Sequence, residues 1–321
     1  MSKYWHKLGR IFDPAEHRLE FGDAGFAQSP QALVLDDRVR VYFSTRTRDI
    51  AGKYRSNVGY VDFDCTLKQI IGVCNEPVIQ LGNLGAFDEH GIFPFNVLND
   101  GDRIIAFSTG WNRRISVSTD AAIGLAQSID GGRSFIKYGE GPVLSPSLHE
   151  PFLVGDAFVK QIDNSYHMWY IHGVRWVRHE GHNNPDRVYK IAHAVSSDAI
   201  NWRRDNRQII SDVLDNDECQ ALPTVIFNDG CYHMLFCFRA ATDFRTNSTR
   251  SYRIGHATST DLQHWTRNDS SWSIDVSTAG WDSEMLCYPH LFELDSQIYL
   301  LYNGNSFGRH GFGLARLEKK S

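Results

Sequence analysis

The chain has 321 residues, and its 42% apolar and 12% aromatic content is ample for a buried core. The formal net charge is −5, with acidic and basic residues interspersed, which excludes the basic footprint expected of a nucleic-acid-binding protein. The sequence has no run of about 18 apolar residues, so we predict no membrane span.

The N-terminal segment MSKYWHKLGRIFDP lacks the apolar stretch of a secretory signal peptide, and we therefore expect a cytoplasmic protein. The sequence has six cysteines and no CxxC pair, which favours reduced thiols in the core over a disulfide framework. These cysteines are Cys65, Cys74, Cys219, Cys231, Cys237 and Cys287.

One strand–turn–strand pattern occurs five times along the chain. A register mark at the start of an apolar strand recurs at Pro30, Pro94, Ala157, Pro223 and Pro289, with spacings of 64, 63, 66 and 66 residues. A period this regular, with Asn, Asp and Gly in the turns, is typical of a propeller-like array. We predict an all-β protein, a five-bladed β-propeller that forms a single domain of residues 1–321.

Three strands are predicted in each unit, in a fixed order. The first strands lie at 32–35, 95–98, 157–161, 224–227 and 290–294, and the second at 39–44, 103–108, 166–171, 231–238 and 297–302. The third strands lie at 57–63, 122–128, 189–196, 252–259 and 311–317. The predicted blades are approximately 21–82, 83–148, 149–212, 213–276 and 277–317.

A fourth, outer strand is predicted to begin at an aromatic residue after a turn that contains Ser and Asp. The N-terminal segment matches such a strand, with Trp5 in the place of Phe135 and Lys7 in the place of Lys137. The last unit stops at Leu317, after its third strand. We therefore expect residues 4–12 to supply the outer strand of the last blade and to close the ring.

Carboxylates recur just before the first strands. They are Asp88, Glu89, Asp156, Asp217, Glu218, Asp282 and Glu284. The first strands of a propeller line its channel, so these residues are predicted to converge on one mouth. Crowded carboxylates in a partly dehydrated channel have their pKa values pushed apart, which provides a general acid and a general base for glycosidic bond cleavage. The alternative for any single carboxylate is a solvated turn residue.

The five-fold repeat, the segment GDAFV at 155–159 and the segment DEC at 217–219 resemble the five-bladed β-propeller glycoside hydrolases of families 43, 62, 32, 68 and 130. The resemblance implies that Glu218 is the general acid and that Asp156 tunes this acid and orients the sugar. At the first-blade position the families have an Asp, whereas this chain has Ser29. The general base is left open among Asp88, Glu89 and Glu284.

The departure at Ser29 brings a second activity into view. The family 130 phosphorylases, which this chain also resembles, let phosphate attack the sugar directly and need a basic anion pocket instead of a base. Guanidinium groups suit phosphate because they bind two oxygens at once. Loop cations lie at Arg113, Arg114, Arg175, Arg178, His179, His182, Arg245, Arg250 and Arg253. The alternatives to a hydrolase are thus a phosphorylase or other sugar transferase, and a non-catalytic glycan-binding propeller.

A carbohydrate substrate requires flat apolar faces and planar hydrogen-bonding groups near the mouth. The candidate binding residues are His90, Trp111, Arg113, Arg175, Trp176, His182, Arg239, Tyr288, His290, Asn303 and Asn305. The predicted activity requires no cofactor, although the resemblance leaves room for a channel cation such as calcium beside a histidine. We predict no nucleic-acid or membrane partner, and the sequence makes no prediction of the oligomeric state.

Overall fold

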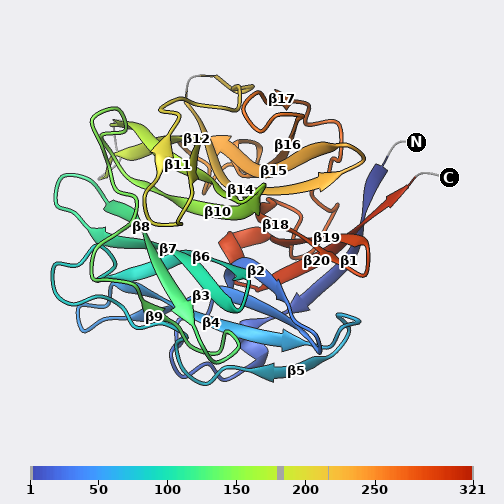
Figure 1. The fold of residues 1–321 in the computed structure, drawn as a ribbon, viewed down its shortest axis with the longest axis horizontal. Coiled ribbons are helices and arrows are strands. Elements are labelled where there is room, and N and C mark those ends of the chain that lie inside the picture. Colours follow the sequence, from blue (N-terminus) through green and yellow to red (C-terminus); the bar gives the residue numbers. More distant parts are fainter. Residues whose placement is uncertain (1–2, 179–183, 216, 320–321) are drawn as a thin grey trace.

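The computed structural model describes residues 3–178, 184–215 and 217–319, and these residues form an all-β fold (Figure 1). Helical structure in this part of the chain is limited to three short 3-10 turns, η1 Pro14–Glu16, η2 Ser248–Arg250 and η3 Asn305–Gly308. Within the same ranges, no helix has the length and apolar character needed to cross a membrane. The prediction of an all-β protein is confirmed.

The strands group into the five repeats that the sequence marks. Repeat 1 contains β2 Gln28–Val34, β3 Val39–Arg48, β4 Tyr54–Phe63 and β5 Ile70–Val73. Repeat 2 contains β6 Gly91–Asp100, β7 Arg103–Arg113, β8 Thr119–Ser128 and β9 Ile136–Lys137. Repeat 3 contains β10 Val154–Ile162, β11 Ser165–Val177, β12 Asp186–Ser196 and β13 Arg203–Arg204.

The remaining strands form the last two repeats. Repeat 4 contains β14 Glu218–Asn228, β15 Cys231–Ala240, β16 Arg253–Ser259 and β17 Thr266–Arg267. Repeat 5 contains β18 Cys287–Leu294, β19 Gln297–Asn303 and β20 Phe312–Lys319, together with β1 Lys3–Phe12. Neighbouring strands within a repeat are antiparallel, and a single parallel bridge between Ser56 and Gly91 joins repeats 1 and 2 into one hydrogen-bonded sheet.

The first strands of the repeats lie around a common centre (Figure 1). β2 contacts β6, β6 contacts β10, β10 contacts β14, β14 contacts β18, and β18 contacts β2. Aromatic side chains fill the space between neighbouring repeats, so that Tyr42 packs on Phe135 and Phe107 packs on Trp202. No repeat could bury its two faces alone, which is why the repeats stack against one another.

The N-terminal strand belongs to the last repeat. β1 runs antiparallel to β20, with Trp5 opposite Leu317 and Phe12 opposite Phe312. The side chains of Trp5 and Phe12 are buried. This pairing confirms the prediction that residues 4–12 supply the outer strand of the last unit.

The turn before each outer strand is built from side-chain hydrogen bonds. In repeat 2 the Asp130 carboxylate accepts hydrogen bonds from the backbone amides of residues 133 and 134 and from Ser128 Oγ at 2.7 Å. The same pattern recurs around Asp198 and Asp261. These contacts confirm the turn predicted from the Ser and Asp residues, and they explain why the turn repeats.

Every first strand has a bulge at its register mark. The strand pairing slips at this point in β2, β6, β10, β14 and β18. Four residues immediately before a mark have a positive φ, at 53° for Ser29, 53° for Asp156, 48° for Leu222 and 58° for Tyr288. A bulge re-aims the side chain that it contains, and strained backbone of this kind collects at functional sites.

Candidate functional site

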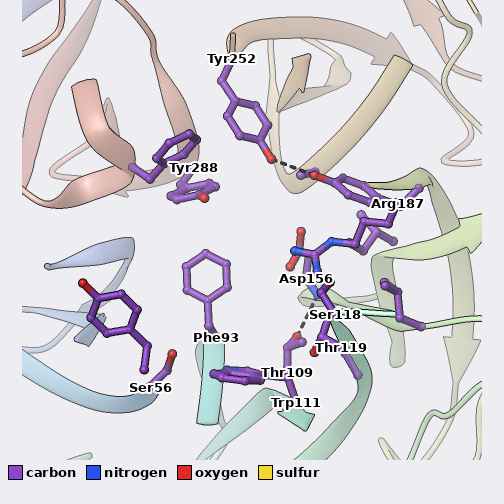
Figure 2. A pocket seen from close by; sticks show the side chains of 18 of the residues that line it. Ser56, Phe93, Thr109, Trp111, Ser118, Thr119, Asp156, Arg187, Tyr252 and Tyr288 are labelled. Atoms are coloured by element: carbon purple, nitrogen blue, oxygen red, sulfur yellow. Dashed lines mark hydrogen bonds between the residues drawn. The ribbon is translucent and has the colours of Figure 1, made fainter. Parts of the chain in front are cut away.

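A cavity of about 620 Å³ opens beside the starts of the first strands (Figure 2). Three of the residues that precede a register mark line it, namely Phe93, Asp156 and Tyr288. The cavity is also lined by the ends of second strands and the starts of third strands, including Arg46, Arg239 and Tyr189. Segments that are far apart in the sequence thus contribute to a single site.

Asp156 is the one carboxylate among the described residues that line this cavity. Its side chain is about nine-tenths buried, and its backbone amide donates a hydrogen bond to Thr109 Oγ1 at 2.8 Å. Burial raises the pKa of Asp156 to about 7, against the opposing effects of the Arg187 charge and of a hydrogen bond from the backbone of Leu222. Near neutral pH this carboxyl group can therefore hold a proton and donate it.

Five arginines share the cavity with this single carboxylate: Arg46, Arg187, Arg239, Arg245 and Arg309. None of the five forms an ion pair with a carboxylate in the part of the chain that the structure describes. Guanidinium groups keep their charge at all ordinary pH values, and the cavity is therefore strongly electropositive.

Arg239 is the most deeply buried of these arginines, with 3% of its surface exposed. Its Nη1 donates to the carbonyl oxygens of Ala240 and Ala241 at 2.8 and 3.1 Å, and its Nη2 donates to Tyr189 Oη at 2.9 Å. Its Nε is buried and has no hydrogen-bond partner in the described structure. A buried donor left in this state is costly, so Arg239 Nε is available for a hydrogen bond to a ligand atom or a water molecule.

Aromatic rings form much of the cavity wall (Figure 2). Phe93 packs edge-on against Tyr288 at 5.2 Å between ring centroids, and Tyr252 packs against Tyr288 at 5.8 Å. Tyr252 and Tyr189 share a hydrogen bond of 2.8 Å between their hydroxyl oxygens. Trp111, also on the wall, provides the flat apolar face on which a sugar ring can stack.

Three of the recurring carboxylates, Asp88, Glu218 and Asp282, lie elsewhere, and together with Glu150 they form ion pairs that repeat from unit to unit. Each pair joins a carboxylate that precedes a first strand to a cation on an outer strand, two residues after that strand's aromatic residue. The pairs are Asp88–Lys137 at 2.5 Å, Glu150–Arg204 at 2.5 Å, Glu218–Arg267 at 2.5 Å and Asp282–Lys7 at 2.7 Å. All four carboxylates are buried, and none lines the cavity.

Glu218, which the resemblance implies is the general acid, is fully buried in such a pair. Its Oε1 accepts from Arg267 and from Gln220, and its Oε2 accepts from the backbone amides of Val213 and Leu214 at 2.9 and 3.0 Å. Both oxygens are occupied within the protein. The structure therefore places Glu218 where it anchors β14 to the outer strand, away from Asp156 and the cavity.

The other candidate bases also lie off the cavity wall. Glu89 Oε2 accepts a hydrogen bond from the amide of Gly85 at 2.9 Å, within its own loop. Glu284 is exposed, and its backbone amide donates to Asn305 Oδ1 at 2.8 Å. Asp217 pairs with Arg175 at the surface. The structure thus brings one of the predicted catalytic carboxylates into the cavity and leaves the others outside it.

Of the predicted binding residues, Trp111, Arg239 and Tyr288 line the cavity. His90 stacks on Trp111 at 6.1 Å from behind it, and Arg113 forms an ion pair with Asp49 at 2.6 Å. These two residues support the rim.

The remaining candidates have structural contacts or lie apart from the cavity. Asn303 bonds to the amide of Ser29 and to the carbonyls of Ala27 and Gly311, and so ties repeat 5 to repeat 1. Arg175 pairs with Asp217 at the surface, and Trp176 packs against the core. His290 is buried, and Asn305 accepts a hydrogen bond from the amide of Glu284. His182 lies outside the described residues.

Arg46, Arg187, Arg309, Tyr189 and Tyr252 line the cavity but were not predicted to bind substrate, although two signals in the sequence point to three of them. Arg46 and Arg239 occupy the same register, each 16 residues after its proline, at the ends of equivalent second strands. Tyr189 and Tyr252 begin equivalent third strands, YKIAH and YRIGH. Arg187 and Arg309 have no such counterpart, and the fold alone brings them to the cavity.

The described residues contain no group of three or more His, Cys, Asp or Glu side chains that could hold a metal ion. His290 is buried without a hydrogen-bond partner for its Nδ1 in the described structure, and burial lowers its pKa to about 3. This histidine is therefore neutral at physiological pH.

No protein-family model matches the chain. Two proteins of Mycobacterium tuberculosis, "Uncharacterized protein MT1551" of strain CDC 1551 / Oshkosh and "Uncharacterized protein Rv1502" of strain ATCC 25618 / H37Rv, are each 33% identical to it over 320 residues. The alignment covers 98% of this chain and 99% of each relative. The chain belongs to the same family as these two proteins.

Solved structures with the same fold include glycoside hydrolases and a mannobiose phosphorylase. A glycoside hydrolase superposes with a TM-score of 0.72 at 15% identity, covering 98% of this chain and 92% of the other. A thermostable family-43 glycoside hydrolase gives 0.65 at 13% identity, covering 92% and 89%. The β-1,2-mannobiose phosphorylase from Listeria innocua, in complex with β-1,2-mannobiose, gives 0.67 at 11% identity, covering 100% and 97%. The chain has the propeller fold of the glycoside hydrolase superfamily that its sequence resembles.

Proposed function

We propose that this family member is a glycoside phosphorylase, which cleaves a glycosidic bond with inorganic phosphate. The observation that carries the proposal is the composition of the cavity, with one carboxylate, Asp156, and five arginines without carboxylate partners in the described structure. Hydrolysis by the standard route uses two carboxylates, one as acid and one as base or nucleophile. A phosphorylase replaces the second carboxylate with a bound phosphate, which arginines hold well.

In the proposed reaction, protonated Asp156 donates its proton to the glycosidic oxygen. An oxygen of phosphate attacks the anomeric carbon, and the bond from that carbon to the leaving sugar breaks. The products are a sugar 1-phosphate and a sugar with a free hydroxyl group, and the proton that phosphate loses restores Asp156. No cofactor takes part in these steps. The raised pKa of Asp156 supports this role, because the group is still partly protonated at neutral pH.

Arg239, Arg245 and Arg187 are the proposed phosphate ligands. Arg239 and Arg245 both lie over the Phe244 ring, at 3.6 and 4.1 Å. Burial lowers the pKa of Arg245, and the charge of Arg239 adds to this effect, so the two positive charges are close enough to repel each other and an anion between them would relieve the repulsion. The partnerless Nε of Arg239 supports this assignment, since a phosphate oxygen would accept its hydrogen bond. Arg187 lies beside Asp156 (Figure 2).

The proposed architecture is a single five-bladed propeller, with blades at approximately 21–82, 83–148, 149–212, 213–276 and 277–317 and with β1 in the last blade. The ring of contacts from β2 through β6, β10, β14 and β18 back to β2 supports this proposal. The single bridge between β4 and β6 joins two blades into one sheet without changing the count.

The proposal is tested by incubating the purified protein with a panel of oligosaccharides, with and without inorganic phosphate, and measuring sugar 1-phosphate. We expect turnover that depends on phosphate and is saturable in it. Equal release of reducing sugar without phosphate would instead identify a hydrolase. Binding of an oligosaccharide with no product under either condition would identify a glycan-binding protein.

A further inference from the structure

The cavity holds more positive charge than one phosphate can balance. Phosphate carries a charge of about −1.5 to −2 near pH 7, and protonated Asp156 carries none. The five arginines contribute one positive charge each. Positive charges gathered in a partly buried cavity repel one another unless further negative charge is bound there.

The arginines come from two pairs of neighbouring repeats. Arg187 on β12, Arg239 on β15 and Arg245 after β15 belong to repeats 3 and 4. Arg46 on β3 and Arg309 after η3 belong to repeats 1 and 5. The first group lies with Asp156 and is assigned to phosphate above.

The second group gathers around one ring, and Arg245 reaches toward this group, since its guanidinium carbon lies 5.9 Å from the centroid of the Phe307 ring in η3. The guanidinium carbons of Arg46 and Arg309 lie over Phe26 at 4.9 and 6.0 Å. Arg46 is also 5.3 Å from the centroid of the Tyr54 ring. Stacked in this way, the planar guanidinium groups are held with their edges available for hydrogen bonding.

Arg46 is fixed in place by a further contact. Its Nε donates to Gln28 Oε1 at 2.8 Å, and Gln28 in turn donates from its Nε2 to the carbonyl of Phe307 at 2.5 Å. The terminal nitrogens of Arg46 have no hydrogen-bond partner in the described part of the chain. Burial lowers the pKa of Arg46, and the charge of Arg245 adds to this effect, so an anion bound here would relieve both.

We propose that the glycan substrate itself carries an oxyanion, a carboxylate or a phosphate ester, and that Arg46 and Arg309 bind it. This inference rests on the proposed function, because it assumes that the arginines nearer Asp156 hold the attacking phosphate. The substrate class is then an acidic oligosaccharide, and the charged sugar occupies the side of the cavity formed by repeats 1 and 5.

The test measures binding by isothermal titration calorimetry, independently of turnover. The probes are glucuronate, galacturonate, glucose 6-phosphate and mannose 6-phosphate, each compared with its neutral parent sugar, with and without saturating inorganic phosphate. We expect at least one acidic sugar to bind at least tenfold more tightly than its parent while phosphate is bound. The uronates and the phosphate esters separate the two sources of the oxyanion.

Matched variants locate the site. Arg46→Gln and Arg309→Gln are expected to lower the affinity for the acidic sugar at least tenfold and to leave phosphate affinity within about twofold. Arg245→Gln is expected to lower the affinity for phosphate at least tenfold and to leave the affinity for the acidic sugar within about twofold. Arg18→Gln is the control, since Arg18 is 91% exposed and lies outside the cavity.

Two outcomes would overturn the inference. One is competitive displacement of the acidic sugar by phosphate, because a single anion site would then serve both ligands. The other is affinity for every acidic sugar no greater than for its neutral parent. Either result leaves phosphate-dependent turnover untouched, whereas absent turnover with intact acidic-sugar binding would refute the phosphorylase proposal and keep the acidic-sugar site.

Discussion

Asp156 combines an unusual backbone with an unusual acidity. Its φ of 53° lies in the left-handed region, and the bulge of β10 directs it to the cavity. Burial raises the pKa of Asp156 to about 7, so folding favours the neutral carboxyl group over the carboxylate. The stability that this group contributes is present in full below about pH 4 and is lost as pH rises through about 7.

Asp156→Asn is therefore expected to separate activity from stability. Turnover should fall by roughly 10²–10⁴-fold, the usual contribution of a general acid. Stability at pH 8 should rise by roughly 2–4 kcal/mol, since each pKa unit is worth about 1.4 kcal/mol. The measurements are initial rates and urea unfolding at pH 5 and pH 8, and the wild-type rate should decline as pH rises through about 7. A variant with full activity would rule out Asp156 as the proton donor.

At the scale of elements, the same ion pair fastens four outer strands to the loops that precede first strands. In this set Glu150 and Glu218 are paired with arginines, whereas Asp88 and Asp282 are paired with lysines. Breaking a buried pair by removing one partner costs about 3–5 kcal/mol, because the other charge is left buried and alone. These ion pairs therefore hold the outer strands in position.

Glu218→Gln is expected to destabilise the protein by about 1–3 kcal/mol, because Arg267 would lose one of its two carboxylate partners and keep only Asp269. Glu284→Gln is the matched control, since Glu284 stands at the same offset from its proline but is exposed, and its effect should be within about 0.5 kcal/mol. Both values come from chemical denaturation. A Glu218→Gln protein of normal stability that is inactive would return Glu218 to the role of general acid.

The sequence predicted the strands well because their period, turns and aromatic residues are local signals. Most of the carboxylates that it singled out lie outside the cavity, because the prediction treated an offset from a proline as a position in space. Glu89, Glu218 and Glu284 share the offset, yet one is bound within its loop, one is buried in an ion pair and one is exposed. The loops that lead into the first strands place these three side chains differently, whereas three of the residues next to the marks, Phe93, Asp156 and Tyr288, line the cavity.

Three of the cavity arginines, Arg46, Arg187 and Arg309, escaped prediction for a different reason. Their significance lies in the carboxylates that they lack, and the absence of a partner is a property of the assembled fold. Arg46 and Arg113 both lie near the end of a second strand, but Arg113 pairs with Asp49 whereas Arg46 lines the cavity. Pairing of this kind across loops has no local signature.

At the scale of the whole molecule, β1 connects the two ends of the chain. Trp5 Nε1 donates to the carbonyl of Trp272 in the segment before repeat 5, Lys3 pairs with Asp229 at 2.7 Å, and Lys7 pairs with Asp282. The strand therefore contacts repeat 4 as well as its own sheet. Without it, β20 would expose an unpaired edge and the pocket of Trp5 and Phe12 would open.

Deletion of residues 1–13 is expected to lower the melting temperature by at least about 10 °C. Burial of Trp5 and Phe12 alone is worth about 1.5–3 kcal/mol each, and about 1 kcal/mol corresponds to 2–4 °C in a protein of 150–250 residues. The measurement is a thermal melt with light scattering, which also reports aggregation through the exposed edge. A melt equal to that of the full chain would show that β1 does not stabilise the fold.

The bulge at the register mark bears on how such proteins diversify. Ser29, Asp156, Leu222 and Tyr288 adopt nearly the same backbone conformation although their side chains are chemically unrelated. Strand pairing on either side of the bulge thus sets the conformation, and the identity of the side chain is free to change. Evolution can exchange the reacting group at one of these positions while the sheets remain as they are. Within such a family, a shared scaffold is then compatible with divergent reactions, and the residue before each mark is the first place to look for the difference.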